Sequence, residues 1–344
     1  CKSNTLYKKN CFTSQIIEIM LKKLLYKINS GKNSKLKYYV LSVYRELFPR
    51  CLLRPFLAKK LEKIIKRDDY EYLMSRANYY CRLESPTQYD KEQWLKESVE
   101  VGKQPMTGQK VFYYDAMKYA RWFSKTLRWI LLPGDIYRDE PLPCVAKSRL
   151  LQAKNANITL FNMDYVRHFI FVNDHIPFSK KENKVIFRGG ISRRNDQRLY
   201  FVKTFFNHPL FDIKVRDKAY PEWWGEKISI QAHLHCKFIM ALEGNDVASN
   251  LKWVMSSNSI AVMPKPTCET WFMEGTLIPN YHYIEVKDDL SDLEERINYY
   301  IEHTDEAEAI VKHAHEYVEV FKNKGREDAI ALLTLDKYFK AVNP

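Results

Sequence analysis

The chain has 344 residues, 46% of them hydrophobic and 14% aromatic, and its formal net charge is +13. This length and hydrophobic content exclude a disordered chain and leave room for two domains of ordinary size. No apolar run reaches about 18 residues and the seven cysteines show no CxxC pair, so we expect no membrane-spanning helix, disulfide framework or zinc site, but reduced thiols in a cytoplasm.

The positive charge is concentrated in the first fifth of the chain. Residues 1–67 contain 17 Lys/Arg and 3 Asp/Glu, so that 38 of the 55 basic and 39 of the 42 acidic residues remain for the rest. Residues 14–29 place five apolar side chains near one face of a predicted helix: Ile16, Ile17, Met20, Leu24 and Leu25. A basic amphipathic helix is typical of binding to an anionic membrane surface, so we predict such a segment over residues 1–36.

Two other interpretations of this basic region stay open. A packed terminal helix whose lysines face water would show the same apolar face. Nucleic acid would be attracted by the same positive field, because phosphate attraction does not depend on sequence. No recognised nucleic-acid-binding motif is present, so we do not expect nucleic acid to be the partner.

Residues 37–182 are predicted to form a first α/β domain. The stretch from Asp68 to about Lys125 has mostly helical patterns, and we expect its aromatic side chains in the core. A Pro133-Gly134 break then precedes Asp135, and further prolines keep the following segment extended. Residues 180–183 are the predicted linker to a second domain.

Residues 183–344 are predicted to form a second α/β domain with a phosphate site. Three apolar runs (185–187, 238–242 and 260–263) alternate with glycine-containing turns and helix-like segments, which is typical of parallel strands joined by helices. Ligands bind at the carboxyl ends of such strands, where helix N-termini face anions. The alternative is a tight turn at Gly189-Gly190 with solvated arginines around it. Four arginines lie near this turn: Arg188, Arg193, Arg194 and Arg198.

Four sequence blocks, in this order, resemble the signature of glycosyltransferase family 90: FRGGISRRNDQR, HCKFIMALEGNDVASNLKW, SNSIAVM and ETWFMEGTLIPNYHYIEV. The resemblance covers rather more than half of the chain and is greatest to the bacterial lipopolysaccharide-core transferases. Fungal capsule xylosyltransferases and eukaryotic protein O-glucosyltransferases belong to the same family. The resemblance implies a GT-B-like α/β fold, in which two Rossmann-like domains hold the donor in the cleft between them.

Such an enzyme must stabilise the diphosphate leaving group of a nucleotide sugar. Metal-dependent transferases commonly do this through a DxD motif, and no DxD occurs in this sequence. We therefore expect no metal and no other cofactor, with UDP as the nucleotide of the donor. Cations and helix N-termini then neutralise the diphosphate, a role that suits arginine because it binds phosphate in a bidentate way.

The resemblance also implies which residues hold the donor. The loop after Gly190 differs in length from that of the eukaryotic relatives, so either Arg194 or Arg198 makes the main contact. Asn250 stands where those relatives carry an arginine, and for Glu269 and Glu274 a helix-capping or surface role is the alternative. The residues expected at the donor are Arg188, Gly190, Ser192, Arg194, Arg198, Ala248, Ser249, Asn250, Lys252, Glu269 and Glu274.

An aspartate of the first domain is the general base in the eukaryotic relatives. Asp135 is the best match and Asp139 the second, whereas a turn-capping role for Asp135 is the alternative. A carboxylate shielded in a cleft can deprotonate the acceptor hydroxyl as the bond to the leaving group breaks, which inverts the anomeric centre. Lys147 and Arg149 are the residues expected to hold an anionic acceptor.

The predicted function is thus an inverting, metal-independent glycosyltransferase that moves a sugar from a UDP donor to a lipopolysaccharide-core or related glycan. We expect it in the cytoplasm, peripheral on the inner membrane of a Gram-negative bacterium. The alternative, from a different class, is a non-catalytic basic protein that binds membrane or nucleic acid and keeps the α/β part as a scaffold.

Overall fold

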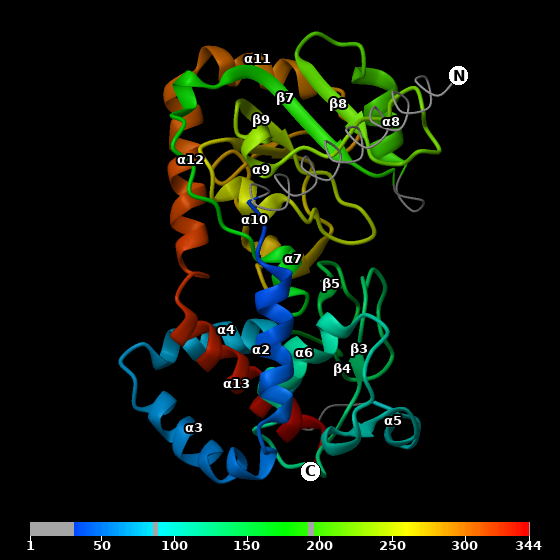
Figure 1. Cartoon of the computed structure of the whole chain (residues 1–344), viewed down its shortest axis with the longest axis vertical. Helices are drawn as coiled ribbons and strands as arrows, with labels where there is room; N and C mark the ends of the chain where they lie inside the picture. Colours follow the sequence, from blue (N-terminus) through cyan, green and yellow to red (C-terminus); the bar gives the residue numbers. More distant parts are fainter. Residues whose placement is uncertain (1–30, 85–88, 192–195, 344) are drawn as a thin grey trace, which may run out of the picture.

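The computed structural model describes residues 31–84, 89–191 and 196–343. The predicted helix over residues 14–29 lies outside these ranges, and so do Ser192 and Arg194. The described residues form a mixed α/β structure with two parallel sheets, one in the upper and one in the lower part of Figure 1. We call the part built by residues 182–319 the upper region. The part built by residues 35–168 together with the last helix is the lower region.

The upper region is built on a five-stranded sheet in the order β12-β10-β9-β7-β8, in which every neighbouring pair is parallel. All three predicted apolar runs are strands of this sheet, so the predicted parallel α/β unit is confirmed. The second run ends two residues earlier than predicted. The strands are β7 (Glu182–Gly189), β8 (Phe211–Val215), β9 (Cys236–Met240), β10 (Ile260–Met263) and β12 (Ile284–Glu285).

Helices cover both faces of this sheet, which explains why β9 and β10 are buried along their whole length and why β10 is a continuous apolar run. Alternate side chains of a strand point to opposite faces of the sheet. On one face Phe187 and Phe238 pack with α8 and α11, and on the other face Ile186 and Ile239 pack with α9 and α10. The helices of this region are α8 (Gln197–Phe205), α9 (Ile230–His233), α10 (Leu251–Met255), α11 (Leu293–Glu302) and α12 (Thr304–Glu319).

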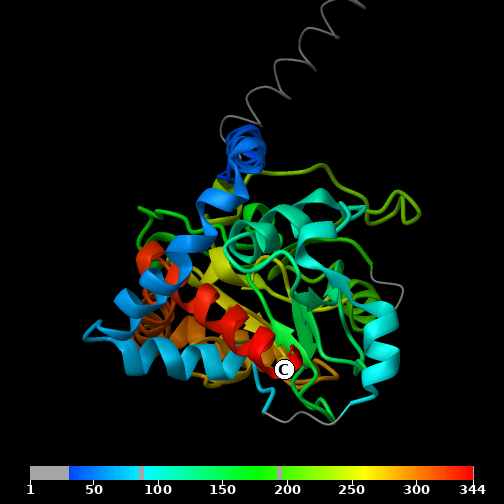
Figure 2. The same ribbon diagram turned by 90° about the horizontal axis from the view of Figure 1, so that it is seen from below.

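The lower region combines a short parallel sheet, β3-β4-β6, with a layer of helices. The chain leaves the upper region after α12 and runs back, so that α13 packs against α4 and α6 (Figures 1 and 2). The elements are α3 (Leu57–Ile65), α4 (Tyr70–Tyr80), α5 (Lys91–Glu97), α6 (Lys110–Ala120), β3 (Leu131–Leu132), β4 (Cys144–Ala146), β6 (Ile158–Leu160), α7 (Tyr165–His168) and α13 (Lys324–Val342).

A two-stranded antiparallel pair joins the regions. Strand β5 (Ser148–Leu150) follows β4 in the lower region, and β11 (Cys268–Thr270) follows β10 of the upper sheet. Thr270 lies opposite Ser148 in this pair. The pairing brings the loops after the upper strands against the lower sheet, which positions the candidate site described below.

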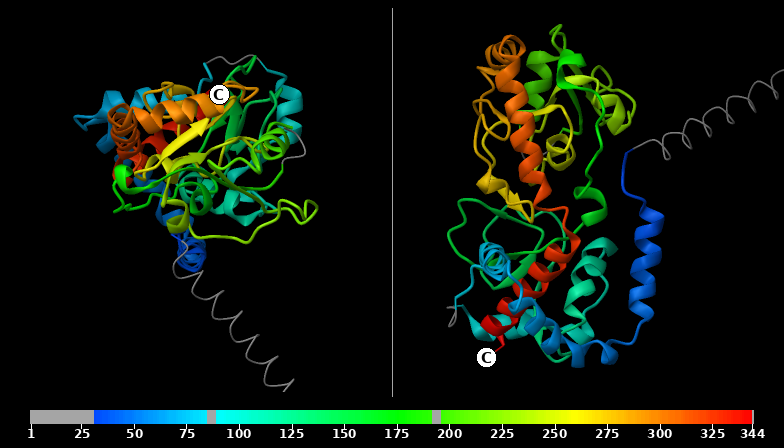
Figure 3. Two further views of the ribbon diagram at one scale, coloured as in Figure 1. Left: turned by 90° about the horizontal axis from the view of Figure 1, so that it is seen from above. Right: turned by 90° about the vertical axis from the view of Figure 1, so that its left-hand side faces the viewer.

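Helix α2 (Lys35–Leu47) lies along one side of the molecule and contacts α6 (Figure 3). At this contact Tyr38 Oη donates to Asp115 Oδ1 at 2.8 Å, and the backbone N–H of Tyr165 donates to Asp115 Oδ2 at 2.9 Å. Burial favours the neutral acid and raises the pKa of Asp115 to about 7, although both hydrogen bonds oppose this. No helix among the described residues combines the length and the apolar character needed to cross a bilayer.

The raised pKa of Asp115 predicts a pH dependence of stability. A carboxyl whose folded pKa exceeds its unfolded value, about 4, stabilises the fold below that value, and this contribution is lost as pH rises through about 7. Asp115→Asn is expected to remove this loss, because it keeps an acceptor for the Tyr165 amide but carries no charge. Melting temperatures at pH 5 and pH 8 measure the effect. Asp305→Asn, at an exposed carboxylate, is the control, and equal slopes for wild type and Asp115→Asn would refute the assignment.

Candidate active site

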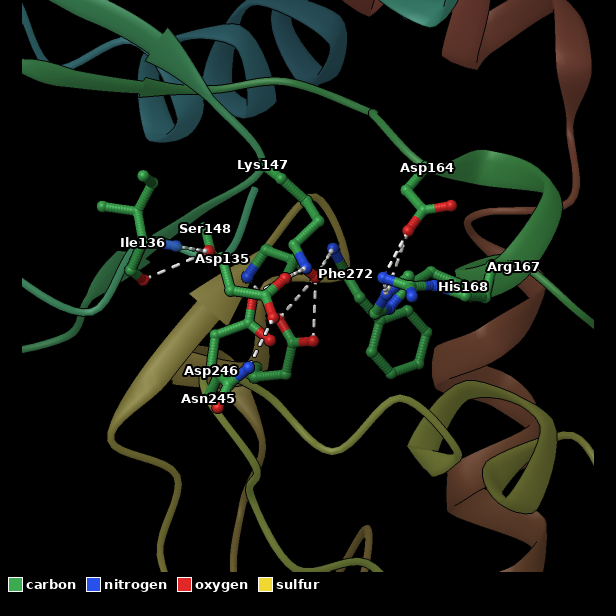
Figure 4. Close-up of polar contacts among 12 residues, drawn as sticks. Asp135, Ile136, Lys147, Ser148, Asp164, Arg167, His168, Asn245, Asp246 and Phe272 are labelled. Carbon is green, nitrogen blue, oxygen red and sulfur yellow. Dashed lines mark hydrogen bonds and ion pairs between the residues drawn. The ribbon is translucent and has the colours of Figure 1, made fainter. Parts of the chain in front are cut away.

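A buried lysine joins two carboxylates where the two regions meet (Figure 4). Lys147, between β4 and β5, contacts Asp135 Oδ1 with its Nζ and lies 2.8 Å from Asp246 Oδ2. Asp135 follows β3 in the lower region, whereas Asp246 belongs to the loop after β9 in the upper region. The lysine thereby brings together the predicted base, a predicted acceptor-binding residue and an acid that sequence reasoning missed.

The turn that carries Asp135 is held in place from both sides. Gly134 has a φ of +102°, a conformation that disfavours residues with a side chain, so the glycine permits the reversal before Asp135. Ser148 Oγ accepts from the Ile136 amide at 3.0 Å. Asn245 Nδ2 donates to Asp135 Oδ2 at 3.3 Å. Asp135 therefore has two fixed partners and keeps 28% of its side chain exposed.

The pKa values of the two carboxyl groups are shifted in opposite directions. Burial disfavours the charge of Asp135, but the attraction of Lys147 and the hydrogen bond from Asn245 outweigh it and hold the pKa of Asp135 below its ordinary value. Burial together with the negative charge of Asp135 raises the pKa of Asp246, whose side chain is 5% exposed. Asp135 has the lower pKa and is the more accessible of the two carboxyl groups, which suits a base acting on a bound hydroxyl.

A second cluster lies beside Lys147 at α7. Asp164 Oδ2 is 2.5 Å from Arg167 Nη2 and 3.7 Å from His168 Nε2. Burial lowers the pKa of His168 well below its ordinary value, and the nearby charges of Lys147 and Lys252 add to this effect. The imidazole is therefore neutral, and its Nδ1 is buried with no hydrogen-bond partner in the described part of the chain.

Arg198 joins the carboxyl ends of β7 and β9. Its Nη1 donates to the carbonyl of Gly190 at 3.0 Å, and its Nη2 donates to the carbonyl of Leu242 at 2.6 Å. Burial lowers the pKa of Arg198 to about 10, partly offset by the charge of Glu243. A Cβ on Gly244 would approach Arg198 Nη2 to 3.1 Å, so the small residue makes room for the guanidinium. The structure thus places Arg198 and Gly190 together at the predicted edge of the sheet.

A cavity of about 180 Å³ lies at this edge, above β9 and β10. Glu243 fixes its wall by accepting from the Thr267 amide at 2.9 Å and from the Cys268 amide at 3.1 Å. Of the predicted donor residues, Ala248 and Glu274 line the cavity. This is the position in which open parallel sheets bind their ligands.

Three other predicted residues have their polar groups engaged within the protein. Lys252 Nζ lies 2.9 Å from Glu274 Oε1, and both side chains are buried. Arg149 Nε lies 2.8 Å from Glu269 Oε1 on the β5–β11 pair, and the other nitrogens of Arg149 donate to backbone carbonyls. The acceptor contact predicted for Arg149 and the donor contact predicted for Glu269 remain predictions. In the described structure the two side chains bind each other.

The remaining predicted residues lie apart from this cavity. Arg188 Nη2 contacts Asp212 Oδ2 at 2.6 Å on β8, and Asn250 Nδ2 donates to the carbonyl of Met240, while Ser249 is exposed. Asp139 accepts from the backbone amide of Lys154 and does not touch Lys147. Across the described ranges, no group of three or more His, Cys, Asp or Glu side chains is arranged to hold a metal ion.

Comparison with known proteins decides the class of this site. The sequence profile of "Glycosyl transferase family 90" matches residues 155–326, half of the chain. The curated protein "O-glucosyltransferase LpsA" of Dichelobacter nodosus is 35% identical over 317 residues, which cover 90% of this chain and 96% of that protein. The chain belongs to glycosyl transferase family 90. The resemblance carried by the four sequence blocks is confirmed.

Membership of family 90 makes the protein a glycosyltransferase, with a nucleotide-sugar donor and a glycan acceptor. This favours the enzyme over the non-catalytic binding protein that the basic N-terminus left open. The matched region contains Arg198, the cavity and Asp246, whereas Asp135 and Lys147 precede it. The alignment with the glucosyltransferase extends over nearly the whole chain.

Proposed function

We propose that this family 90 enzyme transfers glucose from UDP-glucose to a hydroxyl group of a lipopolysaccharide-core or related glycan, with inversion and without a metal ion. The named activity of the 35% identical relative, an O-glucosyltransferase, supports the sugar. The observation that carries the mechanism is the placement of Asp135. It is ionised, partly exposed and held between Lys147 and Asn245 at the junction of the two regions.

In this mechanism Asp135 takes the proton of the acceptor hydroxyl. The hydroxyl oxygen forms a bond to the anomeric carbon while the bond from that carbon to the UDP oxygen breaks, so the leaving group departs with the bonding electrons. One displacement inverts the anomeric centre. Lys147 and Asn245 keep the carboxylate oriented and favour its charged form before the reaction.

We propose that the diphosphate lies at the edge of the upper sheet beside Arg198 and Gly190. Arg198 is a partly buried cation, and its interaction with phosphate there is stronger than it would be in water. The adjoining cavity would take another part of the donor. Ser192 and Arg194, from the same sequence block, remain predicted partners of the phosphates.

The arrangement supports a GT-B-like layout as a proposal. The first domain would comprise residues 37–182 and the second residues 183–344, with α13 reaching back onto the first. Strand β7 begins at Glu182, and the loop that carries Asp246 faces the lower sheet across Lys147. A peripheral location on the cytoplasmic face of the inner membrane, with residues 1–36 as a basic attachment segment, belongs to the same proposal.

The test is a donor assay with UDP-glucose and a lipid-free core oligosaccharide. UDP release and mass spectrometry of the product measure transfer, and NMR of the new linkage gives its anomeric configuration. We expect glucosylated product with inverted configuration, and equal rates with chelator and with manganese. A rate that vanishes in chelator would refute the metal-independent mechanism, and retention of configuration would refute the single displacement.

Arg198→Ala is expected to weaken UDP-sugar binding by about 1.5–3 kcal/mol, the usual cost of losing a charged hydrogen bond. Isothermal titration with UDP measures this loss. Lys203→Ala, at an exposed residue of the same helix α8, is the matched control. Because Arg198 also binds two backbone carbonyls, melting temperatures must be compared. Unchanged UDP affinity in a folded Arg198→Ala variant would place the diphosphate elsewhere.

A further inference from the structure

Helix α2 has its polar side against the protein and its apolar side toward solvent. Ser42 is its one buried residue, and Tyr38, one turn earlier, makes the hydrogen bond to Asp115. Both lie on the side that faces α6. An amphipathic helix at the surface of a globular protein normally buries its apolar face, so this helix has the reverse orientation.

The outward side of α2 carries an apolar stripe. Leu36, Val40, Val43 and Leu47 follow the spacing i, i+4, i+7 and i+11, which places them on one face opposite Tyr38 and Ser42. All four are exposed, with 76% of Leu36 and 78% of Leu47 accessible. Further exposed apolar side chains follow where the chain leaves the helix: Phe48, Leu52 and Phe56. A contiguous exposed apolar surface of this kind marks an interaction site.

The net charge of the segment that carries this stripe favours one kind of partner. Residues 31–67 contain eleven Lys/Arg and two Asp/Glu, for a net charge of +9, whereas residues 68–344 are close to neutral. An apolar face set in a strongly basic segment complements a surface that is both apolar and anionic. The interface of a bilayer that contains anionic phospholipids has both properties.

We propose that α2 is a membrane-docking helix, with Leu36, Val40, Val43 and Leu47 in the bilayer interface. Exposed lysines of the same helix, Lys35 and Lys37, would bind anionic phospholipid headgroups. The helix stands along one side of the molecule with this face uncovered by the rest of the described chain (Figures 2 and 3). The inference rests on the proposed action on a membrane-held glycan. It adds a docking surface in the folded part of the protein, separate from residues 1–30.

Contacts at both ends of α2 fix the helix to the lower region. Arg121 donates to the backbone carbonyls of Arg45 and Phe48 at the end of the helix. Tyr38 binds Asp115 near its start. Because both ends are fixed on the lower region, which carries Asp135, a helix lying in the membrane plane would hold that region in one orientation relative to the lipid.

Flotation of the full chain with vesicles tests the proposal. The vesicles contain either phosphatidylcholine alone or equal parts of phosphatidylcholine and phosphatidylglycerol. We expect salt-sensitive binding to the anionic vesicles, and a partition coefficient lowered by about tenfold or more in Val40→Asp/Leu47→Asp. Leu95→Asp is the matched control, because Leu95 is an exposed helical leucine on α5. Val40→Ala/Leu47→Ala, which adds no charge, should give an intermediate loss.

Transfer to the lipid-free oligosaccharide separates this inference from the proposed function. The Val40→Asp/Leu47→Asp variant should keep wild-type turnover on that acceptor and a wild-type melting temperature. Absent turnover in the wild type would count against the proposed function and leave the vesicle result intact. Three outcomes would overturn the docking role: wild-type vesicle binding by the double variant, loss of all binding on deletion of residues 1–30, or a wild-type dimer that the double variant dissociates.

Discussion

Asp135→Asn is expected to lower turnover by about two to four orders of magnitude, the usual contribution of a positioned general base. The amide has nearly the same shape as the carboxylate but cannot accept the proton of the acceptor hydroxyl. UDP affinity should stay almost unchanged, because Asp135 lies on the lower region and the proposed diphosphate site lies beside Arg198. Steady-state kinetics and UDP titration on the same preparation measure both quantities.

The wild-type pH profile should carry the signature of this carboxylate. Lys147 holds the pKa of Asp135 below its ordinary value against the effect of burial. Activity should therefore persist to pH values below the ordinary range of a carboxyl group and fall as pH drops through the lowered pKa. In Asp135→Asn the remaining activity should no longer fall at low pH in this way, because the variant has no carboxyl group to protonate at this position.

Asp139→Asn is the matched control. Asp139 accepts a backbone hydrogen bond from Lys154 and makes no contact with Lys147, so we expect its substitution to leave turnover near that of the wild type. An inactive but folded Asp139→Asn beside an active Asp135→Asn would move the base to Asp139. If both variants kept full turnover, the proton would leave by another route.

Lys147→Met is expected to destabilise the fold by about 3–5 kcal/mol, because removing one partner of a buried ion pair leaves uncompensated charge. Without the lysine, Asp135 and Asp246 would face each other across the junction. The pKa of Asp135 should rise, and the acidic limb of the pH profile should move to higher pH. Denaturant unfolding and the pH dependence of kcat/KM measure the two effects.

Two further variants separate charge from packing in this prediction. Lys147→Met/Asp246→Asn removes one carboxylate charge together with the lysine, so part of the lost stability should return. Lys181→Met removes a buried lysine that pairs with Asp174 at 2.8 Å and is expected to cost stability without moving the pH profile. A folded Lys147→Met variant with a wild-type acidic limb would contradict the role given to Lys147.

Three strands of the five-stranded sheet were predictable because their signals are local. A continuous apolar run such as 260–263 indicates a strand that is buried on both faces of the sheet. Glycines that follow such a run indicate a turn at the carboxyl edge. Arg198 and the cavity lie at this edge, where the phosphate site predicted from the pattern of strand, turn and helix stays a prediction. Enzyme class followed from the four blocks, which the family match confirmed.

The ion pairs at the junction could not be predicted, because their partners lie far apart in sequence. Lys147 and Asp246 are brought together by the folding of two regions, and nothing in the local sequence of either residue specifies the other. The sequence predicted Arg149 at the acceptor and Glu269 at the donor. In the structure the two side chains form an ion pair on the β5–β11 pair. The Asn245-Asp246 dipeptide directly after Gly244 was the available signal, since polar residues at the carboxyl end of a parallel strand face the ligand edge.

The return of α13 to the lower region has a mechanical consequence. The chain crosses between the regions twice, once between α7 and β7 and once between α12 and α13. Two covalent connections restrict the relative motion of the regions more than a single linker would, because both must stay intact in any rotation. A rotation that parted the regions would separate Asp246 from Lys147 and Asn245 from Asp135, so it would leave Asp135 without one of its two partners.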